Sequence, residues 1–201
     1  MTLIILTLLV SYFLGSIPTG YIFGRMLKGI DIRRHGSQNV GATNVFRVVG
    51  KVPGIIVLFL DALKGFAAVA LAAGFFYKPT VGINIEYFCI MSAMAAVAGH
   101  IWTIFLNFKG GKGVATSTGA LIALMHQVVG ACFVVWVLVF LLTRIVSISS
   151  IIASIALPIF AWVFNRPIEL KVFSVILCII SIYKHTPNIK RLLKGEEKKL
   201  W

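Results

Sequence analysis

Long uninterrupted apolar runs constrain this chain more than any other feature of its sequence. They cover residues 2–24, 52–76, 84–106, 114–142, 146–164 and 168–183. About 20 apolar residues is the length of helix that crosses the hydrocarbon core of a bilayer. A backbone inside lipid must satisfy its own hydrogen bonds, and a helix does so within one segment. The runs therefore predict an all-α polytopic integral membrane protein.

The composition excludes an ordinary soluble domain. Of the 201 residues, 59% are hydrophobic and 12% are charged, and the mean hydropathy is +0.98. Soluble domains carry about 25% charged residues. The stretches between the apolar runs leave no room for a soluble domain, so residues 1–201 are predicted to form a single membrane-embedded domain.

The longest run, 114–142, is predicted to contain a break. As one straight helix it would be about 43 Å long, whereas the hydrocarbon core of a bilayer is about 30 Å thick. The polar residues His126 and Gln127 interrupt the run near its middle. We therefore expect one helix over 114–126 and a second over 128–143, with the polar pair at an outer turn.

The basic residues orient these segments. No lysine or arginine precedes the first run, and four follow it closely, namely Arg25, Lys28, Arg33 and Arg34. Cytoplasmic loops carry the excess of Lys and Arg, so the N-terminus is expected outside and the loop 25–51 in the cytoplasm. Seven transmembrane segments satisfy this rule and place the basic C-terminal tail in the cytoplasm. Five spans with a re-entrant pair keep the same loop sides and remain the alternative.

The formal net charge of +13 raises the question of a nucleic-acid partner. The basic residues lie in the gaps between apolar runs, which indicates membrane orientation and affinity for anionic headgroups or phosphorylated substrates. We therefore expect no nucleic-acid partner. Cys89, Cys132 and Cys178 lie singly inside apolar runs, a pattern typical of small buried hydrophobic residues rather than of disulfides or metal sites.

The most distinctive polar stretch is 108–116, Phe-Lys-Gly-Gly-Lys-Gly-Val-Ala-Thr. Glycines allow successive backbone N–H groups to face one point, and Lys109 and Lys112 add positive charge there. A helix beginning at Val114 or Ala115 would direct the positive end of its dipole to the same place. The stretch is predicted to be a phosphate cradle, although its spacing is not that of a Walker A loop. The alternative is a flexible, positively charged connector.

Two further cytoplasmic stretches carry side chains suited to an oxyanion. The first, 36–47, reads Gly-Ser-Gln-Asn-Val-Gly-Ala-Thr-Asn-Val-Phe-Arg and places neutral hydrogen-bonding groups near one arginine. The second begins with His185, which could donate to a phosphate or accept a proton. The simpler interpretations are a turn-rich polar loop and a histidine at the membrane interface.

Two charged residues lie inside the second apolar run. Asp61 and Lys64 are one helical turn apart and can form an ion pair. Ionisable residues at membrane depth are functional candidates by default. These two are remote from the polar loops, so we prefer a structural bond between helices. Trp102 and Trp162 fall near the ends of runs and are interpreted as interface anchors.

The three polar stretches resemble the motifs of the bacterial acyl-phosphate:glycerol-3-phosphate acyltransferases, the PlsY family. The motifs correspond to residues 36–47, to residues 108–116, and to His-x-x-Asn-Ile-x-Arg-Leu over 185–192 with Gly195 and Glu196. Their order and spacing cover the whole chain. Two positions depart from the usual pattern, since Gln38 stands where glycine is common and Thr103 where proline is common.

The resemblance implies transfer of a fatty acyl group from acyl phosphate to the sn-1 hydroxyl of glycerol 3-phosphate, giving lysophosphatidic acid and inorganic phosphate. It implies a multi-pass protein of the bacterial cytoplasmic (inner) membrane, with the active site facing the cytoplasm. A monomer without cofactor or metal is expected. Acyl phosphate is already activated, so we expect direct attack without a covalent enzyme intermediate. A small transporter of a phosphorylated metabolite is the alternative class.

The resemblance also implies roles for individual residues. Ser37, Arg47 and His185 are expected to be catalytic. The substrate-binding residues are expected to be Asn39, Gly41, Thr43, Asn44, Lys109, Gly110, Gly111, Lys112, Gly113 and Asn188. Glu196 is expected to be structural, together with Asp61 and Lys64. Under this hypothesis Arg47, the two lysines and the amides of 110–113 hold the two phosphates, and a substrate phosphate or His185 accepts the hydroxyl proton.

Overall fold

The computed structural model describes residues 1–200, and the regular elements in that part of the chain are helices throughout. The chain forms two compact units, of which one covers residues 1–124 and the other begins at Met125. The prediction of an all-helical protein is confirmed.

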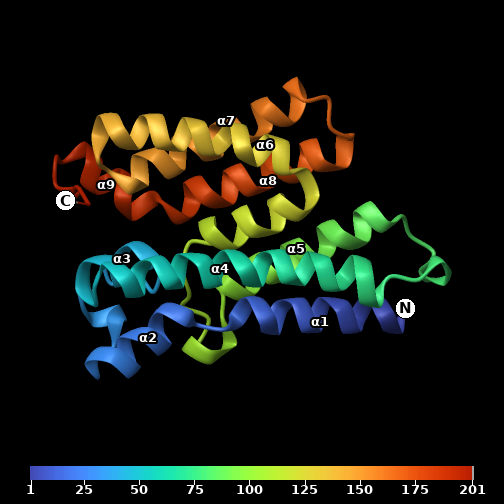
Figure 1. Ribbon diagram of the computed structural model, residues 1–201, viewed down its shortest axis with the longest axis horizontal. Coiled ribbons are helices and arrows are strands. Elements are labelled where there is room, and N and C mark those ends of the chain that lie inside the picture. The colour runs from blue at the N-terminus through green and yellow to red at the C-terminus, as the bar shows by residue number, and fades with distance from the viewer. Residues whose placement is uncertain (201) are drawn as a thin grey trace. The chain divides into compact units, whose positions relative to one another are not determined.

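The first unit is built on three long helices that lie side by side (Figure 1). They are α1 (Thr2–Ser16), α4 (Lys51–Leu71) and α5 (Ile85–Ile101). After a break, α1 is followed by α2 (Thr19–Lys28), and the short α3 (Ala42–Val48) packs on α4. The first part of α6 (Val114–Thr143) also belongs to this unit. Short helical turns cover Ile32–Arg34, Ala72–Phe76, Pro79–Val81 and Ile104–Leu106.

Glycines allow the backbones of α1 and α5 to touch. A Cβ on Gly15 of α1 would overlap the carbonyl of Ala96 in α5, and a Cβ on Gly99 of α5 would overlap the carbonyl of Tyr12. Small residues at crossings are common in membrane helices, because lipid provides little hydrophobic driving force and close packing must hold the helices together. The α1–α5 pair therefore forms a closely packed base for the unit.

The first predicted span is interrupted at Pro18, because proline cannot donate a backbone hydrogen bond. Neighbouring helices supply donors to the carbonyls at the break. Thr103 Oγ1 donates to the Ser16 carbonyl over 2.6 Å, and Lys64 Nζ donates to the Ile17 carbonyl over 2.9 Å. Irregular backbone at membrane depth is tolerated when protein groups satisfy it in this way. Thr103 thus supplies a hydroxyl donor that the more usual proline would lack.

The second unit contains the rest of α6 with α7 (Val146–Val163), α8 (Ile168–Lys184) and α9 (Thr186–Leu193). Ser154 of α7 and Ser181 of α8 share a hydrogen bond of 2.7 Å between their hydroxyl groups. Trp136 of α6 donates through Nε1 to the Ser150 hydroxyl of α7 over 3.2 Å. Polar side chains therefore tie the helices of this unit to one another.

Five helical segments are long and apolar enough to cross a membrane, judged by length and composition. They are Thr2–Lys28, Lys51–Phe76, Ile85–Leu106, Val114–Thr143 and Val146–Val163. The predicted break in the longest run is confirmed, because Met125 leaves helical geometry with φ −154° and ψ 62°. The break lies just before His126 and Gln127. The seven-segment count and the orientation of the termini remain predictions.

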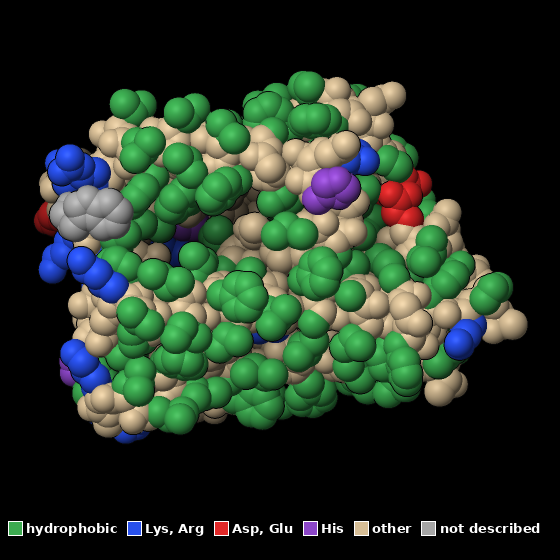
Figure 2. Space-filling model, in the orientation of Figure 1, with side chains coloured by type: hydrophobic (Ala, Val, Ile, Leu, Met, Phe, Trp, Pro, Cys, Tyr) green, Lys and Arg blue, Asp and Glu red, His purple; other side chains and the backbone are tan. Residues whose placement is uncertain are grey.

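Large apolar side chains are exposed along the long helices. Phe59 of α4 is 66% exposed, Phe133 of α6 is 63% exposed and Leu142 of α6 is 86% exposed. Apolar side chains are also spread widely over the face shown in Figure 2. Exposed apolar surface of this extent marks a contact with another apolar phase, here lipid acyl chains.

Candidate functional site

Asn44 organises the first motif. Its side chain is 1% exposed and has partners at both ends. Its carboxamide oxygen accepts from the Ser37 N–H over 2.8 Å, while its NH₂ group donates to the carbonyls of His35 at 3.0 Å and Asn39 at 2.8 Å. The Asn39 side chain accepts from the Gly41 N–H over 2.8 Å. These two asparagines, predicted to bind substrate, are thus engaged in shaping the loop.

The loop held by Asn44 contains two residues in left-handed backbone geometry. Gly36 and Gln38 both have φ +60°. A Cβ on Gly36 would overlap the Asn44 carboxamide oxygen, so glycine is required there by both φ and space. Gln38 adopts left-handed geometry at the position where glycine is common in the motif that this stretch resembles, so the loop keeps its shape at a conformational cost. Ser37, between them, is exposed.

Arg47 lies in the last turn of α3 and is partly buried. Asn44 lies in the same helix and holds the loop through its side chain, so the loop carrying Ser37 and the helix carrying Arg47 are one local structure. Thr43, in the first turn of the same helix, is also partly buried. The first motif therefore carries the Ser37 hydroxyl and the Arg47 guanidinium on one local structure.

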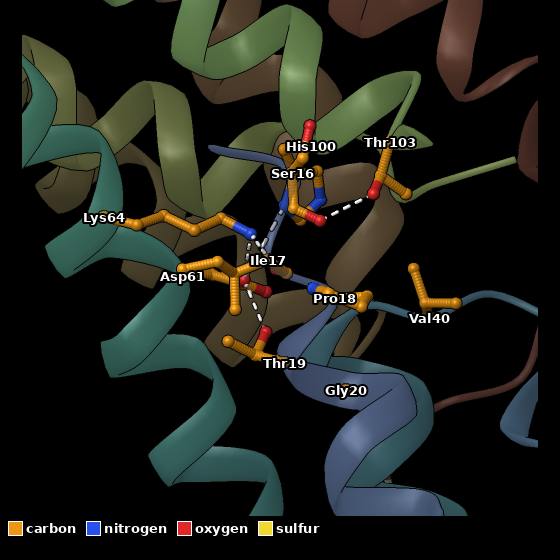
Figure 3. Close-up of a pocket in the computed structure, with 10 residues that line it drawn as sticks. All are labelled: Ser16, Ile17, Pro18, Thr19, Gly20, Val40, Asp61, Lys64, His100 and Thr103. Carbon is orange, nitrogen blue, oxygen red and sulfur yellow. Dashed lines mark hydrogen bonds and ion pairs between the residues drawn. The ribbon is translucent and has the colours of Figure 1, made fainter. Parts of the chain in front are cut away.

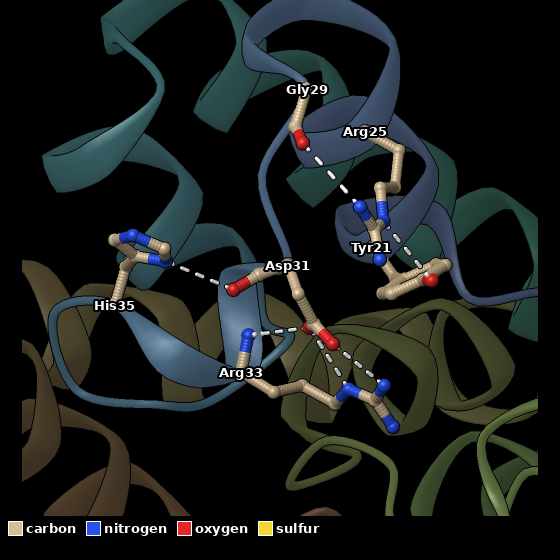
Figure 4. A network of polar contacts seen from close by, with 6 residues as sticks. All are labelled: Tyr21, Arg25, Gly29, Asp31, Arg33 and His35. Atoms are coloured by element: carbon tan, nitrogen blue, oxygen red, sulfur yellow. Dashed lines mark hydrogen bonds and ion pairs between the residues drawn. The ribbon is translucent and has the colours of Figure 1, made fainter.

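The segment before this motif is fixed by Asp31, as Figure 4 shows. Its carboxylate accepts from Arg33 Nη2 at 2.7 Å, from Arg33 Nε at 3.0 Å and from the Arg33 backbone N–H at 3.0 Å. The Arg33 hydrogen bond holds the pKa of Asp31 at about 2. The Arg25 guanidinium donates to the Tyr21 hydroxyl over 3.2 Å and lies over its ring. Arg25 and Arg33 therefore help to shape this segment.

The second motif folds back onto the end of α5. The Gly110 N–H donates to the Ile101 carbonyl over 3.0 Å, and the Gly111 N–H donates to the His100 carbonyl over 3.1 Å. These two amides were predicted to hold a phosphate, but both have protein acceptors in this structure. The groups of the predicted cradle that are left to contact a phosphate are therefore the side chains of Lys109, which is exposed, and Lys112, which is partly buried. The turn at Gly113, where φ is +84°, follows them.

The α6 helix begins at Val114, immediately after this loop, as the sequence predicted. Helix N-termini favour anions because their first N–H groups are unpaired within the helix and the dipole is positive there. The two lysines of the loop therefore precede a helix start that adds to their positive potential.

A small hydrophobic cluster joins the first two motifs within the first unit. Leu106, which ends the apolar run before the second motif, packs in one cluster with Val40 and Val45 of the first. Ile32 and Val57 complete the cluster, and all five side chains are at most 5% exposed. Both loops are therefore attached to the same buried support.

A buried ionic cluster lies at the break between α1 and α2 (Figure 3). The predicted Asp61–Lys64 ion pair is present, with Nζ 2.8 Å from Oδ1 and both side chains at most 5% exposed. Asp61 Oδ1 also accepts from Thr19 Oγ1 over 2.6 Å, and His100 Nδ1 lies 3.6 Å from it. The adjoining cavity is about 10 Å³, room for about one water molecule.

Sequence reasoning missed the part that His100 and Thr19 play in this cluster. The only signal in the sequence was that each is a polar residue in the last part of an apolar run, Thr19 in 2–24 and His100 in 84–106. That signal is weak, because an isolated polar residue can also be satisfied locally by the helix backbone.

The third motif lies in the second unit. His185 stands at the junction of α8 and α9 and is 2% exposed. Its Nδ1 is 2.8 Å from the Ser181 carbonyl, and because a carbonyl only accepts, Nδ1 is the protonated nitrogen. Nε2 then carries the lone pair of the neutral ring and becomes a donor when the ring is protonated. His185 thus has the orientation expected of a proton acceptor or a phosphate ligand.

Glu197, and not the predicted Glu196, forms the structural carboxylate of this motif. Its Oε1 accepts from Asn188 Nδ2 at 2.5 Å and from the Ser147 hydroxyl at 2.8 Å, and its Oε2 accepts from Arg191 Nε at 2.6 Å. Burial would raise the pKa of Glu197, but these hydrogen bonds outweigh it and lower the pKa below its ordinary value. The Glu196 side chain is exposed. The correction follows from chain direction, because the turn at Gly195 aims the next residue outward and the one after it inward.

The described residues thus offer hydrogen-bond donors and cations rather than a nucleophile paired with a base. Within residues 1–200, no three His, Cys, Asp or Glu side chains are grouped to hold a metal ion. Arg47, Lys109 and Lys112 are suited to binding and stabilising anionic oxygen. Such an arrangement fits chemistry on phosphorylated substrates.

Comparisons with known proteins agree with this chemistry. A family model described as glycerol-3-phosphate acyltransferase matches residues 5–195. A protein of Moorella thermoacetica named glycerol-3-phosphate acyltransferase 2 is 44% identical over 196 residues, covering 98% of this chain and 97% of that protein. The glycerol-3-phosphate acyltransferase of Prochlorococcus marinus is 45% identical over 204 residues, covering 100% of this chain and 98% of that protein.

Two solved structures are similar over nearly the whole chain. Both are crystal structures of PlsY (YgiH), described as an integral membrane glycerol 3-phosphate acyltransferase, and both are 39% identical to this chain. The glycerol 3-phosphate form has a TM-score of 0.88 and the lysophosphatidic acid form a TM-score of 0.85. In each case the match covers 98% of this chain and 94% of the other.

Proposed function

The chain belongs to the glycerol-3-phosphate acyltransferase family of integral membrane proteins, and from this membership we propose that it transfers a fatty acyl group from acyl phosphate to the sn-1 hydroxyl of glycerol 3-phosphate. The products would be lysophosphatidic acid and inorganic phosphate. This is a step of phospholipid synthesis at the membrane that receives the product.

One observation carries the proposal. The chain aligns over 98% of its length with the glycerol 3-phosphate form of PlsY, at a TM-score of 0.88. The first two polar motifs, and residues 185–192 with Gly195 of the third, lie within the residues that the family model matches, 5–195. The alternative of a phosphorylated-metabolite transporter has less support, because the matching family model and the similar proteins are named acyltransferases.

In the proposed reaction, the sn-1 hydroxyl oxygen attacks the carbonyl carbon of acyl phosphate. An ester bond forms, the bond between the acyl carbon and the phosphate oxygen breaks, and inorganic phosphate leaves. The hydroxyl proton passes to a phosphate oxygen of a substrate. The donor is already activated, so positioning and charge stabilisation suffice without a covalent enzyme intermediate.

The residues of the first unit would supply that stabilisation. Arg47 would bind a phosphate through two parallel N–H groups, because the planar guanidinium can donate to two phosphate oxygens at once. Lys109 and Lys112 would neutralise phosphate charge that increases on the leaving group. The exposed Ser37 hydroxyl would donate to a phosphate oxygen. Its backbone is held by Asn44, which supports the assignment because a fixed donor loses little entropy on binding.

His185 of the second unit would hold a phosphate rather than act as the base. The Ser181 carbonyl fixes Nδ1–H, so a protonated ring would direct its second N–H from Nε2. Asn188 was expected to bind substrate, but its side chain donates to Glu197. We therefore propose that Asn188 mainly supports the segment that carries His185.

The remaining expectations belong to the same proposal. Seven transmembrane segments, an external N-terminus and a cytoplasmic C-terminus would place the active site on the cytoplasmic face of the bacterial inner membrane, with the enzyme working as a monomer. The exposed apolar helices support a multi-pass membrane location.

The test is an acyl-transfer assay on purified protein in lipid vesicles. Radiolabelled glycerol 3-phosphate is supplied with acyl phosphate or with acyl-CoA at equal concentration. We expect lysophosphatidic acid and inorganic phosphate in a ratio of about one to one with acyl phosphate, and no product with acyl-CoA. Equal rates with both donors would refute the acyl phosphate assignment, and uptake of glycerol 3-phosphate without acylation would favour transport. The variant His126→Ala, which changes an exposed position of the second unit, should show the same preference between the two donors as the unaltered protein.

A further inference from the structure

His100 connects the buried ionic cluster to the second motif. Its side chain is 7% exposed, and Nδ1 lies 3.6 Å from Asp61 Oδ1. Asp61 is itself held by Thr19 of α2 and Lys64 of α4 (Figure 3). On the side of Nδ1 the imidazole therefore faces a carboxylate that residues of two helices, α2 and α4, hold in place.

The opposite side of the same imidazole faces Gly111. A Cβ added to Gly111 would overlap His100 Nε2. The main chain of His100 contacts the loop as well, because its carbonyl accepts from the Gly111 N–H over 3.1 Å. A Cβ on Gly110 would instead overlap the His100 carbonyl oxygen, which no change of side chain removes. Gly110 and Gly111 are thus held against different parts of one residue.

We propose that His100 is a positioning residue, which transmits the fixed geometry of the Asp61–Lys64–Thr19 cluster to the glycine-lysine loop. The loop carries Lys109 and Lys112, so its placement sets where those two cations meet phosphate. This inference rests on the proposed function. It gives the Asp61–Lys64 ion pair, which is remote from the polar loops, a part in placing one of them. The cluster lies inside the first unit, and His100 links it to the loop.

Paired substitutions separate the two sides of the imidazole. An asparagine at position 100 places an amide N–H near the position of Nδ1 and removes the atoms near Nε2. A glutamine places its amide near the position of Nε2 and gives up the Nδ1 contact. We expect Gly111→Ala to raise KM for glycerol 3-phosphate about tenfold or more with a smaller change in kcat, since the displaced loop binds phosphate less well.

The expected signature is selective rescue. His100→Asn with Gly111→Ala should restore KM to within about threefold of His100→Asn alone, because the overlapping atoms are gone. His100→Gln with Gly111→Ala should not recover. Gly110→Ala should recover with neither, because its obstacle is the His100 carbonyl. Gly111→Ala and His100→Asn effects that simply add, or equal rescue of Gly110→Ala, would overturn the proposal.

Thermal unfolding of the same variants keeps the inference separate from the proposed function. Destabilisation by Gly111→Ala should be relieved by His100→Asn and not by His100→Gln, whatever reaction the enzyme performs. If the wild-type enzyme fails to use acyl phosphate while the unfolding pattern holds, only the function is wrong. If the unfolding pattern holds but KM is unchanged in every variant, the loop does not bind phosphate and the positioning role is rejected. His126→Ala should leave both measurements unchanged.

Discussion

At position 47, arginine and lysine carry the same charge but present it differently. Arg47→Lys loses the planar fork that binds two phosphate oxygens at once. We expect kcat/KM to fall about 100-fold or more, about 3 kcal/mol of transition-state stabilisation, which is the scale of removing one charge-stabilising donor. Steady-state rates of acyl transfer in lipid vesicles measure kcat/KM for the two proteins. Arg34→Lys, at an exposed position of the preceding segment, is the control, and a fully active Arg47→Lys enzyme would contradict the proposed site.

The proton acceptor can be identified at position 185. If a substrate phosphate takes the proton, His185→Ala should lower kcat/KM through weaker phosphate binding, and the pH dependence near pH 6 should survive because phosphate itself titrates there. If His185 were the base, the variant would lose that limb of the profile. Rate measurements from about pH 5 to 8 decide the question, and a flat profile for His185→Ala would overturn our assignment.

Gln38 offers a stability test of backbone geometry. Left-handed geometry costs a residue with a side chain about 1–2 kcal/mol, whereas glycine adopts it freely but loses about 0.5–1 kcal/mol more in entropy on folding. Gln38→Gly should therefore stabilise the protein slightly, with Tm raised by about 2 °C. Gln127→Gly should instead lower Tm, because it removes the side-chain oxygen that accepts from Arg166 Nη2 over 2.6 Å and adds glycine to a helical segment. A lower Tm for Gln38→Gly would show that the side chain makes a stabilising contact.

At the scale of elements, the C-terminal segment depends on Glu197. Its pKa lies below the ordinary value near 4.5, so its stabilising effect is fully present above pH 4.5 and is lost as the pH falls through the lowered pKa. Glu197→Gln removes hydrogen bonds to a charged group, a loss of about 1.5–3 kcal/mol at neutral pH. Unfolding curves at pH 7 and pH 4 should show a lower Tm and a weaker pH dependence for this variant. The adjacent Glu196→Gln is the matched control, and equal effects of the two would refute the assignment.

The same scale explains why the first span tolerates a break. Proline removes a backbone donor and leaves carbonyls without helical partners. Lys64 of α4 and Thr103 of the turn that follows α5 supply the missing donors. The interruption therefore contributes to packing, because it brings the ends of α1 and α2 against residues of other helices.

At the scale of the whole molecule, the orientation of the chain can be tested by labelling. After replacement of the three native cysteines, Asn165→Cys should react with a membrane-impermeant thiol reagent added to intact cells, and Arg34→Cys only after the cells are opened. The reason is the excess of basic residues in the loops predicted to be cytoplasmic. Labelling of Lys198→Cys from outside would reject the seven-segment orientation. Activity of each variant before labelling verifies folding.

The sequence by itself determined the helical membrane class, the break in the longest run and the hydrogen-bond donors and cations that the polar stretches contain. These depend on local properties, because apolar length, polar interruptions and runs of glycine with lysine act over a few residues. The Asp61–Lys64 pair was predictable for the same reason, since two residues one turn apart on a helix face each other.

Only the tertiary structure decided which polar groups remain for a ligand. Asn44, Gly110 and Gly111 are predicted from the sequence to bind phosphate. In the structure, the Asn44 carboxamide and the Gly110 and Gly111 N–H groups form hydrogen bonds with other groups of the protein. Glu197 replaces Glu196 because the direction of the chain after Gly195 selects one of two adjacent carboxylates. His100 gains its place between Asp61 and Gly111 from contacts that are distant along the chain. A donor inventory can be read from a sequence, but the partner that each donor finds is set by the packing of the helices.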